Sequence, residues 1–99
     1  MIIEVFQFKT KPEFSDEEVL AASKEGQINF LAKQKGYVSR ELAKSSEGEW
    51  VDITHWEMLE DAVADEKAFM EAPSTQKFLG MMDLSSMKMV RWEVLKTYE

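Results

Sequence analysis

Residues 37 to 56 read YVSRELAKSSEGEWVDITHW and decide the fold. They contain two of the three tryptophans and the only histidine of the chain. The turn-forming residues Ser45 to Gly48 divide the segment in two. The run from Trp50 to Glu57 is rich in aromatic and β-branched residues, which pleated strands favour. This pattern predicts a β-hairpin.

The second run of the hairpin carries large side chains on both faces. Trp50, Thr54 and Trp56 alternate with Val51 and Ile53. A strand with one face in water would alternate more cleanly between apolar and polar residues. Either helices cover one face of the sheet and a second sheet covers the other, or another element buries both.

The rest of the chain supplies two helices and two more strands. Ser15 and Glu18 form a capping-box signature that begins a helix, and Gly36 supplies a left-handed stop after about Lys35. The expected elements are a strand over 2–9, a helix to about 35, the hairpin over 37–57, a helix over 60–70, a short helical turn over 73–80 and a strand over 87–98.

This β-α-β-β-α-β order predicts an α+β, ferredoxin-like fold in which residues 1–99 form a single domain with one antiparallel sheet. Two helices can cover only one face of such a sheet, yet the strands are apolar on both. A self-complementary contact between two copies would bury the second face, and two-fold contacts are the commonest symmetry. We therefore expect a homodimer that packs sheet to sheet.

Composition excludes several classes of protein. Twelve basic and nineteen acidic residues give a net charge of −7, which disfavours nucleic acid and anionic membranes as partners. The absence of cysteine removes disulfides and thiolate chemistry. The start of the chain does not resemble a signal peptide, so we expect a cytoplasmic protein. No zinc-protease, phosphate-loop or nucleophile-elbow motif occurs, and we expect no metal.

The first helix has an unusual inward stripe. At about 100° per residue, Val19, Ser23, Gly26, Gln27 and Phe30 fall on one face. Small and polar residues there indicate either close packing of the helix backbone or the wall of a cavity.

Glu66 is a charged residue on an otherwise apolar face of the second helix. Leu59, Ala62, Val63 and Phe69 share a face in which Glu66 is central. A carboxylate in that position must be paired, become protonated or face water at the helix edge. His55 is the other candidate for acid–base chemistry, although a lone strand histidine is more often a satisfied buried group.

The chain resembles the antibiotic biosynthesis monooxygenase-like family of dimeric α+β barrels over nearly its whole length. The resemblance rests on the order of elements, on Gly36-Tyr37, on the run from Trp50 to Glu57 that leads to Ala62, and on the aromatic residues Phe69 and Phe78. It implies a ligand pocket between sheet and helices with Trp56 in its wall. It places Gln7 near the first-strand asparagine of haem-degrading members, and Glu66 where many relatives have a helix histidine. Ala62 to Gly80 contains no histidine that could bind haem iron.

Two hypotheses follow. In the first, the protein is a cofactor-independent oxygenase or isomerase that acts on a small aromatic or hydrophobic compound, with His55 or Glu66 as the base. In the second, it is a non-catalytic dimer that binds a small hydrophobic ligand or assists another protein. The residues that we expect to contact the ligand are Gln7, Gln27, Trp56, Met81 and Trp92.

Overall fold

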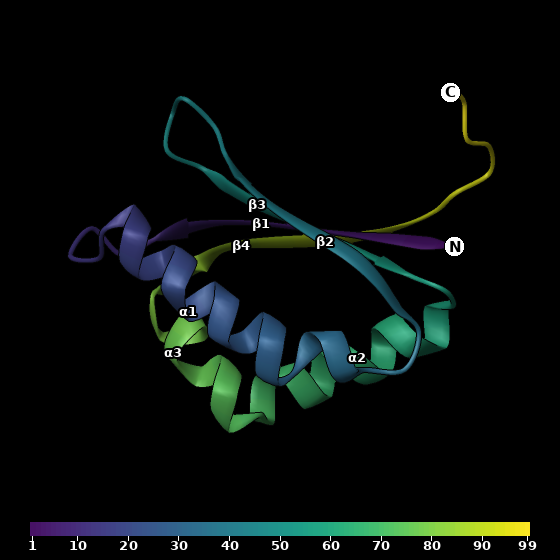
Figure 1. Cartoon of the computed structure of the whole chain (residues 1–99). Coiled ribbons are helices and arrows are strands. Elements are labelled where there is room, and N and C mark those ends of the chain that lie inside the picture. The colour runs from purple at the N-terminus through teal and green to yellow at the C-terminus, as the bar shows by residue number, and fades with distance from the viewer.

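The four strands form one sheet, and the helices between them cover one of its faces (Figure 1). The computed structural model describes residues 1–99 and shows all helices below a single sheet (Figure 1). The strands are β1 (Ile2–Thr10), β2 (Tyr37–Lys44), β3 (Trp50–Trp56) and β4 (Met82–Glu93); the helices are α1 (Asp16–Asn29), η1 (Leu31–Lys33), α2 (Leu59–Glu71), η2 (Pro73–Thr75) and α3 (Gln76–Gly80).

The four strands are antiparallel and lie in the order β2-β3-β1-β4. This order confirms the ferredoxin-like α+β fold. The predicted hairpin is also confirmed, with Gly48 at φ 88° in its turn. None of the helices has both the length and the apolar character needed to cross a bilayer.

Helix α1 begins as expected and ends earlier than expected. Ser15 accepts a hydrogen bond from the Glu18 backbone, and the Glu18 side chain accepts one from the Ser15 backbone. The helix stops at Asn29 instead of continuing to Lys35, because Phe30 leaves the helical conformation at φ −135° and packs edge-on against Phe69. The backbone then turns through η1.

Strand β4 begins at Met82 and ends at Glu93, about five residues before each predicted boundary. Within it, Val90 pairs with Val5 of β1 and Trp92 pairs with Ile3, so both side chains lie on the same face of the sheet. The early start follows from α3, which ends at Gly80 and returns the chain directly to the sheet.

The two faces of the sheet have different surroundings. The inner face packs on the helices through two apolar clusters, which we call the Trp50 cluster and the Trp56 cluster. The outer face is not covered by any element of the chain (Figure 1). The Trp50 cluster comprises Phe8, Val19, Ala22, Trp50, Phe78, Met81 and Met82, and the Trp56 cluster comprises Ile2, Leu31, Trp56 and Ala62.

Candidate functional site

A cavity lies on the inner face of the sheet between the two clusters. Strand β3 carries Asp52 and Thr54 between its two buried tryptophans, and β1 carries Glu4 and Phe6 between Ile2 and Phe8. About 70 Å³ is unoccupied, which is room for a few water molecules. The lining residues are Glu4, Phe6, Leu31, Arg40, Asp52, Thr54, Asp65, Glu66, Phe69, Met70, Phe78, Leu79, Met82 and Met89.

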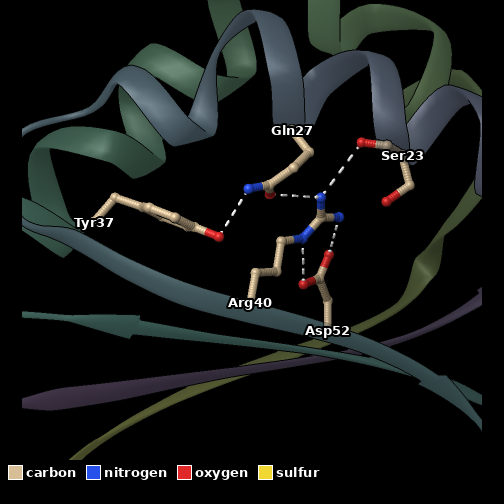
Figure 2. A network of polar contacts seen from close by, with 5 residues as sticks. All are labelled: Ser23, Gln27, Tyr37, Arg40 and Asp52. Atoms are coloured by element: carbon tan, nitrogen blue, oxygen red, sulfur yellow. Dashed lines mark hydrogen bonds and ion pairs between the residues drawn. The ribbon is translucent and has the colours of Figure 1, made fainter.

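One wall of the cavity is a buried ion pair. Arg40 of β2 donates from Nε and Nη2 to the two carboxylate oxygens of Asp52, at 2.8 and 2.6 Å (Figure 2). Its Nη1 donates to the Ser23 carbonyl and to the Gln27 side chain, which also donates to the Tyr37 hydroxyl. All three guanidinium nitrogens are therefore engaged, and the network ties β2 and β3 to α1.

This network answers the question raised by the first-helix stripe. Gly26 lies against the turn after α2, where an added Cβ would make an ordinary van der Waals contact with Thr75 at 3.5 Å. Ser23 and Gln27 serve the arginine network. The stripe is thus a close-packed and hydrogen-bonded surface, and none of these residues lines the cavity.

A second cluster of charges lies on the other side of the cavity. Arg91 of β4 donates from Nε to Glu4 at 2.9 Å, and its Nη2 lies 3.4 Å from the carboxylate of Glu66. Burial raises the pKa of Glu4 above its usual value, and the hydrogen bond and charge of Arg91 act against that rise.

Asp65 of α2 lines the same cavity as the acids of these two pairs, and it makes neither an ion pair nor a hydrogen bond through Oδ1. The residue is 5% exposed. Burial raises the pKa of Asp65 from 3.8 to about 7, and the nearby charge of Glu4 adds to the rise. The group therefore exists in both protonation states near neutral pH, as a group that exchanges protons with a ligand must.

The candidate residues from the sequence are distributed over three environments. Glu66 lies on the rim of the cavity with its side chain 54% exposed, as the edge interpretation expects. Gln27 contacts the cavity wall through Arg40. Met81 and Trp56 are buried in the Trp50 and Trp56 clusters, and neither lines the cavity.

The other three candidates lie on the outer face. His55 and Trp92 both pair with Ile3 across the sheet, on the side away from the helices. Gln7 points to the same side and is exposed. In a single subunit these residues cannot reach the cavity. Their roles as base and ligand contacts therefore stay predictions, and they would require a ligand that binds on the outer face.

The sequence reasoning missed Asp65, Glu4, Arg40 and Arg91. The expected face of the second helix included Leu59 and Val63, which are about half exposed, and the face that is buried is that of Ala62 and Asp65. One signal was present: Glu4, between Ile2 and Phe6, is a charged residue inside an otherwise apolar face of a strand. A charge in such a position needs a partner or a function.

Fold and cavity together define a class: a ferredoxin-like α+β subunit with an acidic, aromatic-lined cavity between its sheet and its helices. Comparison by sequence finds no matching family model and no matching curated protein.

Solved structures of the same fold are numerous, and several are named antibiotic biosynthesis monooxygenases. SnoaB from Streptomyces nogalater, a cofactor-independent oxygenase, aligns with a TM-score of 0.72 at 14% identity over 97% of this chain and 94% of its own. A Bordetella bronchiseptica protein that carries the monooxygenase name aligns with a TM-score of 0.77 at 13% identity over 96% and 97%. Rv0793 from Mycobacterium tuberculosis aligns with a TM-score of 0.70 at 13% identity over 99% and 98%. At these identities the likeness establishes a shared fold.

Proposed function

We propose that the protein is a cofactor-independent oxygenase that acts in the cytoplasm on a small aromatic compound bound in the cavity, with Asp65 as the proton acceptor. The observation that carries the proposal is a buried carboxyl group with a free oxygen and a pKa of about 7 in an aromatic-lined cavity. Perturbed groups of this kind concentrate at functional sites. The cofactor-independent activity of SnoaB, on the same fold, supports this reaction class.

The proposed chemistry uses groups that line the cavity. Asp65 Oδ1 accepts a proton from an acidic C–H or O–H bond of a quinol-like or anthrone-like substrate. The resulting carbanion adds to molecular oxygen and, with a proton, gives a hydroperoxide at that carbon. Loss of the second hydrogen of the same carbon then breaks the O–O bond, so that one oxygen atom stays in the product as a carbonyl group and the other leaves as water. Phe6, Phe69 and Phe78 would hold the ring, because aromatic rings pack well against one another.

A substrate needs more room than the unoccupied volume provides. Met70, Met82 and Met89 lie in the cavity wall, and methionine side chains adapt their shape at little cost. We expect these side chains to move when a ligand enters. Glu66, at the rim, would then lie beside the entrance.

Oxygen uptake with anthrone and 1,4-naphthohydroquinone tests the proposal. We expect turnover above the rate in buffer, and a loss of about 100-fold or more in Asp65→Asn, in line with removal of a general base. Glu60→Gln, an exposed acid on the same helix, is the matched control and should retain full activity. Full activity in Asp65→Asn would show that another group is the base.

A second function, binding of a small hydrophobic ligand without catalysis, is favoured by the limited free volume. It would stand if no compound supported oxygen uptake while aromatic compounds still raised the melting temperature.

We further propose that two copies pack through their outer faces. Val5, Ile53 and Val90 form an apolar row across three strands, and Trp92 beside them is 57% exposed. The tip of the β2–β3 hairpin and the C-terminal end both curve to this uncovered side (Figure 1). A self-complementary apolar surface framed in this way fits a second copy of the chain better than an unrelated partner. Sedimentation at micromolar concentration tests it, and a stable monomer would refute it.

A further inference from the structure

The charged groups around the cavity are unequal in number. Four carboxyl groups, from Glu4, Asp52, Asp65 and Glu66, face two guanidinium groups, from Arg40 and Arg91. Each arginine is paired with an acid of the chain, and of the two only Arg40 lines the cavity. A ligand that enters therefore meets four acids and one arginine, whose nitrogens are all engaged.

Arg40 has no guanidinium nitrogen free to bind an anionic ligand. Two of its nitrogens bind Asp52, the third binds the Ser23 carbonyl and Gln27, and its side chain is 6% exposed (Figure 2). Its guanidinium also lies 5.5 Å from the centre of the Phe78 ring. Binding a carboxylate there would require breaking the bond to Asp52, which would leave Asp52 buried and unpaired.

Arg91 is held between two acids. Its Nε binds Glu4 and its Nη2 faces Glu66 at 3.4 Å, a distance too long for a good hydrogen bond. This Nη2 is buried and has no hydrogen-bond partner. Arg91 does not line the cavity, whereas Glu4, Glu66 and Asp65 do, so a ligand carboxylate would meet these acids before it reached the unpaired nitrogen.

Asp65 supplies the polar contact that the cavity does offer. Its free Oδ1 can donate a hydrogen bond when protonated and accept one when ionised. An uncharged hydroxyl group on the ligand satisfies either state, because it both donates and accepts. A ligand carboxylate can only accept a hydrogen bond, and its charge repels the ionised form of Asp65.

We propose that the cavity selects uncharged, hydroxyl-bearing aromatic ligands and rejects carboxylate-bearing ones, because Glu4 and Asp52 occupy the two arginines that would otherwise bind an anion. The inference rests on the proposed function only in taking the same cavity as the ligand site. It assigns Glu4 a role in specificity: its carboxylate fills the position that an anionic ligand would take.

The test compares 2-naphthol with 2-naphthoate, which share a ring system and differ in charge at pH 7. Dissociation constants are measured by calorimetry or NMR titration in the absence of oxygen, so that no turnover occurs. We expect 2-naphthol to bind at least 10-fold more tightly than 2-naphthoate. Equal or tighter binding of 2-naphthoate would overturn the proposal, as would no binding of either compound at millimolar concentration.

The variant Glu4→Gln releases Arg91 and should raise affinity for 2-naphthoate at least 10-fold, with less than a threefold change for 2-naphthol. Glu66→Gln, which removes the more distant and exposed acid, should give a smaller rise and provides a variant with little risk to folding. Glu60→Gln, an exposed acid on α2 that does not line the cavity, is the control for net charge. An equal rise in Glu60→Gln would overturn the role of Glu4.

Failure of this inference and failure of the proposed function give different results. Selective binding of 2-naphthol without oxygen uptake on any compound would support the selectivity and refute the oxygenase. Tight binding and oxidation of carboxylate-bearing aromatics would refute the selectivity and support the oxygenase.

Discussion

At the centre of β3, the inner and outer faces of the sheet invert the usual relation between burial and polarity. On β3, the inner residues Asp52 and Thr54 are buried under helices and are polar, while the outer residues Val51 and Ile53 are apolar and have no helix over them. A covered face normally holds the apolar residues. This difference fits our two proposals, a ligand cavity at the polar centre of the inner face and a contact with a second copy on the apolar outer face.

The largest expected difference between the faces is between two tryptophans. Trp56, which is fully buried on the inner face, should cost about 3–5 kcal/mol of unfolding free energy when replaced by alanine. Trp92→Ala, on the outer face, should cost little in a dilute subunit and should instead shift the sedimentation equilibrium from dimer to monomer. Urea unfolding at low and high protein concentration separates these effects. A Trp92→Ala protein that stays dimeric would contradict the assignment of the outer face.

The next effect tests the charges of the inner face. Arg40→Ala should cost about 3 kcal/mol, because it leaves Asp52 buried without its partner. Lys44→Ala removes the exposed pair with Asp16 and should cost under about 1 kcal/mol. Chemical denaturation measures both values. Similar costs for the two variants would mean that the inner pair is far more solvated than its 6% and 11% side-chain exposures indicate.

Asp65 makes the stability of the inner face depend on pH. Its pKa is about 7 in the fold against an ordinary 3.8, so between these values the folded chain binds more protons than the unfolded chain. Stability contributed by the protonated group is present below about pH 4 and falls as the pH rises to about 7. The raised pKa of Glu4 acts in the same direction.

Asp65→Asn should remove that loss and increase the unfolding free energy at pH 8 by about 2 kcal/mol. This is below the upper limit of ~1.4 kcal/mol for each pH unit between the ordinary pKa of 3.8 and the pKa of about 7 in the fold. Melting curves at pH 5 and pH 8 measure the change, and Glu60→Gln provides the comparison. An Asp65→Asn protein as pH-dependent as the wild type would show that Asp65 does not titrate in this range.

The smallest expected effect concerns the start of α1, one of the helices that cover the inner face. Ser15→Ala removes a hydrogen bond of the capping box at the start of α1 and should cost about 1 kcal/mol. Ser39→Ala, exposed on the outer side of β2, should cost nearly nothing. Thermal unfolding would resolve the pair, and equal values would mean that the cap is not needed to hold α1.

Local patterns in the sequence predicted the fold well. Alternation around Trp50 to Trp56, the Ser15 cap and the left-handed conformation of Gly36 are short-range signals, and the structure confirms each of them, although Gly36 does not end α1. The ends of α1 and β4 were wrong because tertiary contacts, such as Phe30 on Phe69, decided where the chain turned.

Such local patterns could not predict the charged residues at the centre of the site. Glu4 and Arg91 are separated by 87 residues, and only the register of β1 against β4 brings them together. Asp65 was overlooked because Leu59 and Val63 made a neighbouring face of α2 more apolar than the one that packs. The face that a helix buries depends on the elements it packs against. A stripe of apolar residues in the sequence predicts that face only coarsely.

The methionines in the cavity wall carry a chemical consequence. Met70, Met82 and Met89 are thioethers placed where a substrate and oxygen would meet. Peroxide released in the cavity by an incomplete turnover would oxidise these methionines to sulfoxides, which are polar and bulkier. Prolonged turnover should therefore add mass in steps of single oxygen atoms and slowly close the cavity to its own ligand.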